Sequence, residues 1–289
     1  MKKTENQTNY SHGIDSFTMQ TLLKIVLLIL LVLTLMPVIV TIILSLKPDV
    51  DYYNGKSIWT LTLIPQWSNY SIALGEIIPS MINTLFIDIV STSAMIFISA
   101  YVAYIFVRHE FSGKKTLFYL IILPMLVPGI VSLTPQYLVM VNLNLLGSRW
   151  SLILPYVAGN QIASIFLFRT FMGQQPKDIY ESAELDGAGN FIMYFRICLP
   201  LSLAIIMVQS VAIFAAIYND YLWPLMMFVG NEDRSTLMPR LKDLASSVSD
   251  VHPGAAYALY LLSGIPLVIT TVISLKFFIN GEFASGLKL

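Results

Sequence analysis

Six stretches of this chain are apolar over a length that suits a membrane-spanning helix. Because a helix rises about 1.5 Å per residue, about 20 apolar residues cross a hydrocarbon core about 30 Å thick. The predicted spans are residues 22–46, 79–107, 116–137, 150–171, 199–218 and 257–278. Hydrophobic residues form 56% of the chain and charged residues only 12%, which argues against a soluble domain. The sequence therefore predicts an all-α polytopic membrane protein with six transmembrane helices, built as one domain over residues 1–289.

The distribution of Lys and Arg predicts the topology of these spans. Cytoplasmic loops carry an excess of basic residues, and with the N-terminus inside, 11 of the 17 lie on the cytoplasmic side. Three of the other six fall in the long segment 219–254, and long segments count less in this rule. The first span is too long for a cleaved signal peptide and has no small-residue cleavage site before Lys47, so it is expected to remain as an anchor. Both termini and the polar segment between spans four and five are therefore expected in the cytoplasm.

Neither a metal site nor a disulfide framework is indicated. Cys198 is the only cysteine, and the three histidines, His12, His109 and His252, are scattered. The 17 basic and 17 acidic side chains balance, so the charge gives no reason to expect a nucleic-acid partner. The hydrolase motifs H-E-x-x-H and G-x-S-x-G do not occur, and we expect no catalytic residue in the chain.

A short polar helix is predicted in the cytoplasmic segment 175–200. Pro176 suits the first helical position, because its missing N–H group is not needed there, and Asp178 lies near the positive end of the helix dipole. Gly187 offers a left-handed C-terminal stop. Such a helix either docks on another protein or lies on lipid as an interfacial helix. For docking, the sequence offers two small residues, Ser182 and Ala183, and three apolar ones, Ile179, Tyr180 and Leu185.

This segment resembles the EAA loop of ABC importer permeases. That loop has Glu-Ala-Ala, a Gly after three further residues, and Ile-x-Leu-Pro after about nine more. The corresponding residues here are Glu181-Ser182-Ala183, Gly187 and Ile197-Cys198-Leu199-Pro200. Leu185-Asp186-Gly187-Ala188 is similar to the Ile-Asp-Gly-Ala of the carbohydrate-uptake branch, represented by maltose-system permeases. Further similar residues are spread over the chain and include Asn83-Thr84-Leu85, Phe111-Ser112-Gly113-Lys114, Pro128-Gly129 and Tyr218-Asn219-Asp220-Tyr221.

The chain departs from the family pattern at a few positions. Ser182 replaces the middle Ala of the loop, Tyr218 stands where Trp is usual, and Ala204 stands where Pro is common. The C-terminal residues 286–289 also differ from the usual tail. The Ser182 change is sterically mild, whereas the tail puts in doubt any contact that the family's C-terminus makes with the ATPases.

The resemblance implies a division of labour between several subunits. It implies that the chain pairs with a second, homologous permease, that two ATPase subunits each bind one coupling helix, and that an extracytoplasmic binding protein delivers a sugar. No G-x-x-x-x-G-K-[ST] motif occurs, so ATP and Mg²⁺ are expected in the partner ATPases and no cofactor in this chain. The resemblance also implies a multi-pass protein of the bacterial cell membrane, in contact with lipid.

The resemblance further implies roles for single residues of the loop. Glu181 is expected to make polar contacts with the ATPase, and Ser182 and Ala183 to give a close steric fit. Asp186 belongs to the same coupling motif, and Gly187 supplies the turn back to the membrane. Closure of the ATPases would then move this helix and rock the attached spans between inward-open and outward-open states.

Candidates for the translocation path lie in spans two and five. A polyhydroxylated ligand needs rings to stack on and amides to hydrogen-bond. The candidates are Asp88, Gln209, Phe214, Tyr218 and Asn219. For Tyr218 the alternative is an aromatic belt at the membrane surface. These residue types suit a mono-, di- or oligosaccharide and a uronic-acid polymer alike.

Asp88 keeps one alternative function open. It is the only acidic residue deep in the predicted spans, and an intramembrane carboxylate often marks a cavity, a proton relay or a buried partner. A proton-coupled secondary transporter would also be polytopic, but such folds show internal repeats and clustered ionisable residues, and this sequence shows neither. We therefore expect Asp88 to face a wet cavity or to hydrogen-bond across helices.

Overall fold

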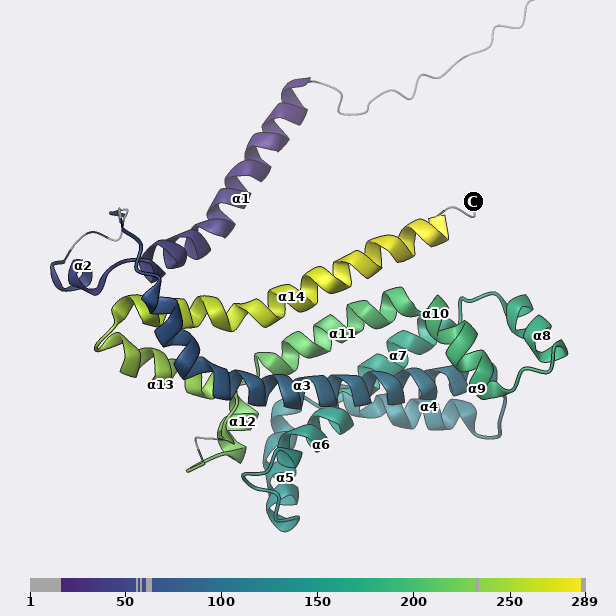
Figure 1. Ribbon diagram of the computed structural model, residues 1–289. Coiled ribbons are helices and arrows are strands. Elements are labelled where there is room, and N and C mark those ends of the chain that lie inside the picture. The colour runs from purple at the N-terminus through teal and green to yellow at the C-terminus, as the bar shows by residue number, and fades with distance from the viewer. Residues whose placement is uncertain (1–16, 56, 58, 61–63, 232–233, 287–289) are drawn as a thin grey trace, which may run out of the picture.

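The computed structural model describes residues 17–55, 57, 59–60, 64–231 and 234–286, and within them it contains helices and turns but no strand. Figure 1 shows an elongated helical bundle with α8 (Lys177–Leu185) at one end and α2 (Asp49–Tyr53) at the other. The predicted all-α fold is confirmed. Residues 1–16, which include Lys2 and Lys3, Lys56 and the C-terminal residues 287–289 lie outside the described residues, so the side on which each terminus lies stays a prediction.

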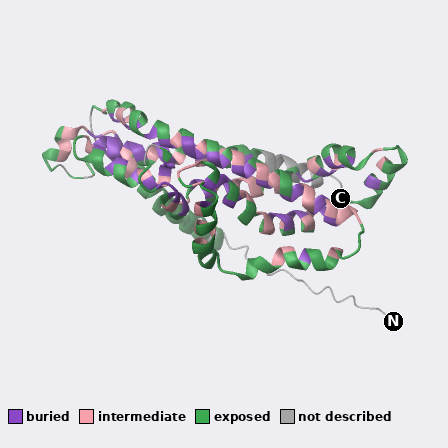
Figure 2. Cartoon of the chain, turned by 90° about the horizontal axis from the view of Figure 1, so that it is seen from below, coloured by how far each residue is buried: buried purple, intermediate pink, exposed green. Residues whose placement is uncertain are grey.

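The core of the bundle is organised around one long helix. It is α3 (Ser68–Arg108), whose 41 residues are about twice what a bilayer requires and reach both ends of the bundle. It packs against α7 (Gln161–Met172), α11 (Leu203–Tyr218) and α14 (Pro253–Gly286). Its fully buried residues include several small ones, which let neighbouring helices approach closely: Ser91, Ser99, Ala100 and Ala103. Figure 2 shows the buried residues on the inside of the bundle and the exposed ones over its outer faces.

Four helical stretches of the described chain are long and apolar enough to cross a membrane, and six if each of two bent pairs is counted as one span. The unbent stretches are residues 19–45, 68–108, 150–172 and 253–276, the third of which joins α6 (Trp150–Gly159) to α7. The six predicted spans are thus recovered, two of them in bent form.

The third span is bent near two prolines. It consists of α4 (Lys114–Ile122), the 3-10 helix η1 (Leu123–Leu126) and α5 (Gly129–Asn142), with a bend of 100° between the two halves. Pro124 lies in η1, and Pro128 precedes α5 with an extended ψ of 129°. Pro135 lies in the interior of α5, which continues through it.

The predicted fifth span, residues 199–218, is wrong as one straight helix. The chain runs through α9 (Asn190–Met193), the π-helical η2 (Tyr194–Cys198) and α10 (Leu199–Leu201), and then bends by 76° into α11. Ser202 stands at this break with φ −95° and ψ 3°. Pro200 contributes to the break, because it has no N–H group with which to continue the helical hydrogen bonds.

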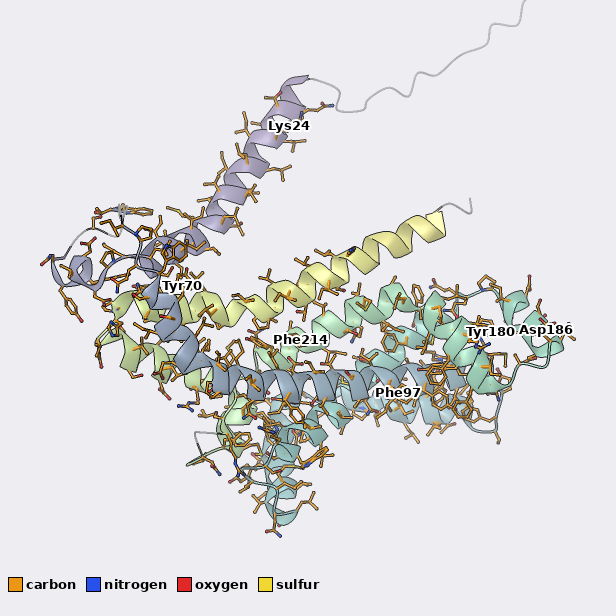
Figure 3. The ribbon with its side chains drawn as sticks, in the orientation of Figure 1. Lys24, Tyr70, Phe97, Tyr180, Asp186 and Phe214 are labelled. Carbon is orange, nitrogen blue, oxygen red and sulfur yellow. The ribbon has the colours of Figure 1, made fainter. Side chains whose placement is uncertain are left out.

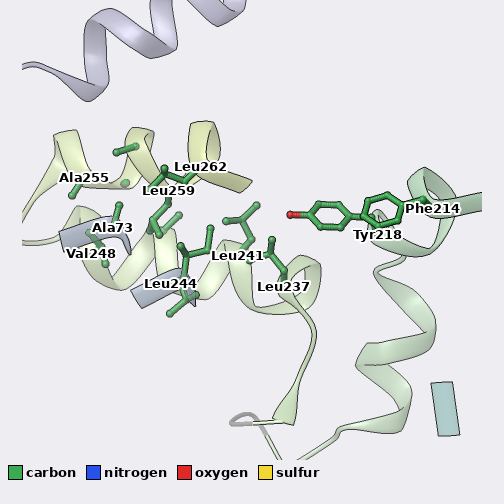
Figure 4. Close-up of a cluster of buried hydrophobic side chains, with 14 residues drawn as sticks. Ala73, Phe214, Tyr218, Leu237, Leu241, Leu244, Val248, Ala255, Leu259 and Leu262 are labelled. Carbon is green, nitrogen blue, oxygen red and sulfur yellow. The ribbon is translucent and has the colours of Figure 1, made fainter. Parts of the chain in front are cut away.

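The end of the bundle opposite α8 is closed by a packed amphipathic helix. α13 (Leu237–Ser249) lies in the long segment 219–254, between α12 (Leu222–Met227) and α14. Besides Pro239, its buried residues follow helical spacing and are Leu237, Leu241, Leu244, Ala245 and Val248. They join Ala73 and Ile77 of α3 and Leu259 of α14 in one buried cluster (Figure 4).

Two neighbouring residues of α3 hold the start of α13. The Leu237 N–H donates to Thr84 Oγ1 over 2.7 Å, and Asn83 Nδ2 donates to the carbonyl oxygens of Arg234 and Ser235. The Arg149 side chain donates from Nε to Asn83 Oδ1 over 2.6 Å. Asn83 and Thr84 therefore fix the start of α13 to the core of the bundle.

α1 (Phe17–Ser45) diverges from the rest of the bundle, as Figure 1 shows. It packs against α14, but no residue in its most apolar window is buried. A helix with mean hydropathy 3.1 in that window is suited to lipid or to another apolar surface rather than to water.

Candidate functional site

Pro176 and Gly187 flank the helix α8. Pro176 precedes it with an extended ψ of 130°, so this proline lies just outside the helix and not at its first position as predicted. Asp178 is in the first turn, where its charge complements the helix dipole. Gly187 follows the helix with φ +80°, the left-handed conformation predicted for it.

The C-terminal end of α8 is a Schellman motif. The Ala188 N–H donates to the Ala183 carbonyl over 2.9 Å, and the Gly187 N–H donates to the Glu184 carbonyl over 3.0 Å. These bonds satisfy carbonyls that a helix end leaves free. A Cβ atom at Gly187 would meet no other atom within 4 Å, so only the positive φ requires glycine there.

The outer face of α8 is acidic and carries one apolar side chain that is almost fully exposed. Leu185 is 90% exposed, and Glu181, Glu184 and Asp186 are exposed around it. Ser182 is also exposed and donates its hydroxyl to the Asp178 carbonyl over 2.7 Å. Of the five predicted coupling residues, only Ala183 turns partly inward, where it packs against the buried cluster under the helix.

The inner face of α8 is anchored by Tyr180. This side chain is 4% exposed and packs with Tyr104, Phe168 and Tyr194 of the bundle. The prediction that Tyr180 supplies contact to a docking partner is therefore wrong. The Arg108 guanidinium lies 3.4 Å from the centroid of the Tyr180 ring, in cation–π contact. Burial raises the pKa of the Tyr180 phenol above its ordinary value, which keeps it a neutral donor. Figure 3 shows Tyr180 and Asp186 at the α8 end.

Two buried polar residues complete this anchor. The Tyr180 hydroxyl donates to Gln175 Oε1, and Gln175 Nε2 donates to Ser202 Oγ over 2.8 Å. Gln175 is 8% exposed and Ser202 is fully buried. The sequence interpretation missed both, because each is an isolated polar residue. Only their places, one just before α8 and one just before α11, set them apart.

A cavity of about 690 Å³ lies beside α11 and is almost wholly apolar. Its size is within the range of ligand pockets. It is lined by Ile89 and Phe97 of α3, by Phe195 of η2, and by Phe214 of α11, among other residues. Figure 3 labels Phe97 and Phe214, which come to this region from two different helices.

The predicted path residues have different positions in the structure. Phe214 lines the cavity. Tyr218 is 1% exposed and donates to the Ser263 carbonyl over 2.7 Å, so it ties α11 to α14 and does not belong to a surface belt. Gln209 donates to Ser164 Oγ over 3.0 Å and ties α11 to α7. Asn219 donates back to the Ala215 carbonyl at the end of α11.

Asp88 lies inside the bundle, one turn before Thr92 of the cavity wall. It is 0% exposed, and Thr92 donates to its Oδ1 over 3.0 Å. This bond lies within α3, so the hydrogen bond expected across helices is not found at Oδ1, and Oδ2 makes none to the described residues. No group of three or more His, Cys, Asp or Glu that could hold a metal ion occurs in the part of the chain that the structure describes.

Comparisons with known proteins identify the family. A model of the binding-protein-dependent transport system inner membrane component matches residues 94–280, which is more than half of the chain. The arabinooligosaccharides transport system permease protein AraQ of Bacillus subtilis is 27% identical, over 92% of this chain and 95% of its own length. The maltodextrin transport system permease protein MalD of Streptococcus pneumoniae is 26% identical, over 93% of each chain.

A solved structure has the same fold. It is a bacterial ABC transporter involved in the import of the acidic polysaccharide alginate, and the superposition gives a TM-score of 0.77 at 18% sequence identity. The match covers 90% of this chain and 96% of the other chain. The overall fold of this chain is therefore one that is already known from an importer.

Proposed function

The chain belongs to the family of binding-protein-dependent transport system inner membrane components and is a permease subunit of an ABC importer, and we propose that it carries a sugar or oligosaccharide. The names of the relatives AraQ and MalD, which are permeases for arabinooligosaccharides and maltodextrin, support this cargo class. The aromatic side chains of the cavity suit the C–H faces of sugar rings.

One observation carries the proposed mechanism, namely that α8 is held to the bundle by its inner face while its outer face is free to bind a partner. The exposed Leu185 with Glu181 beside it suits a groove on an ATPase subunit. In this proposal two ATPases, which hold ATP and Mg²⁺, each bind one such helix, one from this chain and one from a second permease. A binding protein delivers the sugar from outside, and both termini lie in the cytoplasm of a bacterial cell.

The proposed path runs along the cavity wall formed by α3 and α11. Phe214 is the predicted path residue that lines it, and Asp88 lies one turn away from the lining residue Thr92. The ties made by Gln209 and Tyr218 position α11 rather than the sugar. A proton-coupled mechanism is not favoured, because the chain belongs to the family of binding-protein-dependent transport system inner membrane components and has the fold of a chain from an ABC transporter.

Transport by the assembled complex tests the function. The chain is co-expressed with its partner permease, ATPases and binding protein, reconstituted in proteoliposomes, and supplied with labelled maltotriose, arabinotriose or an alginate oligosaccharide. We expect uptake of at least one of them only when ATP and the ATPases are present. Uptake driven by a proton gradient without ATP, or uptake by this chain alone, would contradict the proposal.

A further inference from the structure

Gln175 joins the two ends of the cytoplasmic segment that contains α8. Its amide oxygen accepts a hydrogen bond from the Tyr180 hydroxyl, and its amide nitrogen donates to Ser202 Oγ over 2.8 Å. A glutamine amide can do both at once, because it carries a donor and an acceptor at one end of the side chain. We refer to Tyr180, Gln175 and Ser202 as the Gln175 bridge.

The bridge ends at the break in the fifth span. Ser202 separates α10 from α11, where the helix direction changes by 76°. Its N–H donates to the carbonyls of Cys198 and Leu199, over 3.0 and 3.1 Å, and its own carbonyl accepts from the Ile206 N–H at the start of α11. Because π-helical turns such as η2 are frequent at functional sites, this break has the features of a hinge.

The helix beyond the break forms a wall of the cavity. Leu203, Ile206, Ser210 and Phe214 of α11 line it. The bridge therefore connects α8, through Tyr180 and Gln175, to the first residue before that wall. On the other side Tyr180 stacks on Arg108, the last residue of α3, which lines the same cavity through Ile89 and Phe97.

We propose that the Gln175 bridge is the connection through which movement of α8 turns α11 at Ser202, so that Gln175 is a positioning residue for opening and closing the cavity. This inference rests on the proposed function, in which ATPases move α8. All three members are buried, so the loss of either hydrogen bond leaves polar groups that water cannot satisfy. The bridge therefore holds α8 in one position relative to the break.

A thiol-labelling experiment tests the bridge without knowledge of the sugar. In the reconstituted complex, Ser210→Cys places a reactive thiol in the cavity wall, while the buried Cys198, which contacts Tyr180 and Ser202, is kept. The rate of maleimide labelling is compared with and without ATP plus vanadate, which holds the ATPases closed. In the parent we expect a change of about fivefold or more, within the usual range of coupling between two sites.

The bridge variants should lose this change while the complex remains assembled. Gln175→Leu and Ser202→Ala each break the bond between the two ends, so each should abolish the ATP-dependent change, and the double variant should be no worse than either. Ser202→Thr keeps the hydroxyl and should retain it. Gln174→Leu makes the same substitution at the neighbouring exposed glutamine and is the matched control. Copurification of the ATPases should be the same in all variants.

The outcomes separate this inference from the function on which it rests. A parent that shows no ATP-dependent change overturns the coupled movement and with it the bridge. A parent that responds, together with a Gln175→Leu variant that responds equally, overturns the bridge alone. Loss of the response in Gln174→Leu as well would show that any change before α8 disturbs the segment, and it would also count against a specific role of Gln175.

Discussion

The two ends of the bundle are held together in different ways. At the α2 end, side chains from α3, α11, α13 and α14 form one buried cluster, and Asn83 and Thr84 add hydrogen bonds to it. At the α8 end, Tyr180 is the one residue of α8 that is fully buried. Deeply packed regions open only with the whole fold, whereas a helix with a single anchor can move at low cost. The α2 end therefore provides stability, and the α8 end is suited to transmit movement.

The largest effect on stability is expected at the packed end. Leu237→Ala removes a fully buried side chain of α13 and should lower the free energy of unfolding by about 2–5 kcal/mol, because a cavity replaces the lost packing. Denaturant titration of the purified chain in detergent measures this change. Leu225→Ala, at an exposed leucine of the same end, is the control and should have little effect. Equal losses for both leucines would show that the cluster is not the main support of this end.

A smaller effect is expected at the turn that follows α8. Gly187→Val forces a β-branched residue into φ +80°, which should cost about 1–3 kcal/mol and displace the helix end. ATP-dependent uptake should be lost even where the chain still folds. Gly189→Ala is the matched control, since Gly189 has φ −76° and free space around a Cβ atom. Full uptake by the Gly187→Val complex would remove the turn from the coupling mechanism.

A still smaller effect on stability is expected at Tyr180, the residue that anchors α8. Tyr180→Phe keeps the ring on Arg108 but removes the hydroxyl that donates to Gln175, and it should destabilise the chain by about 1 kcal/mol. The same detergent unfolding titration gives the value. A loss as large as that of Leu237→Ala would mean that the two ends are equally cooperative.

The smallest effect on stability is expected at the outer face of α8. Leu185→Ala changes a side chain that is 90% exposed, so the free energy of unfolding should stay within about 0.5 kcal/mol. If α8 docks on an ATPase, the same change should weaken that binding by more than about 1 kcal/mol, as measured by titration of the purified ATPase. Unaltered binding would contradict a contact at Leu185.

Local properties of the sequence explain which features could be predicted. The length of the apolar stretches predicts the spans, the backbone restriction of Pro124 and Pro128 predicts the bend in the third span, and the freedom of Gly187 predicts a left-handed stop. Each depends on one residue or one continuous stretch. The same local properties predict a helix at the position of α8, and most of its predicted coupling residues are exposed in the structure.

Features that join distant residues could not be predicted in this way. The sequence of α8 places Tyr180 among the residues that contact a partner. It does not reveal that the Tyr180 ring packs against Arg108 and that its hydroxyl donates to Gln175. Tyr218 is a predicted sugar-path residue, but its hydroxyl donates a hydrogen bond to the carbonyl of Ser263, 45 residues later in the chain. In both cases the residue type is compatible with a surface or with a core, and the partner across the bundle decides between them.

The hydrogen bond between Gln175 and Ser202 also has a consequence for how such a subunit can change during evolution. The bond brings the two ends of the segment that contains α8 together at one place in the bundle. Substitutions on the exposed outer face of α8 need not shift the helices that surround the cavity, whereas exchange of the whole segment would also replace Phe195 in the cavity wall. The surface that α8 presents to a partner can therefore change during evolution while the lining of the cavity is conserved.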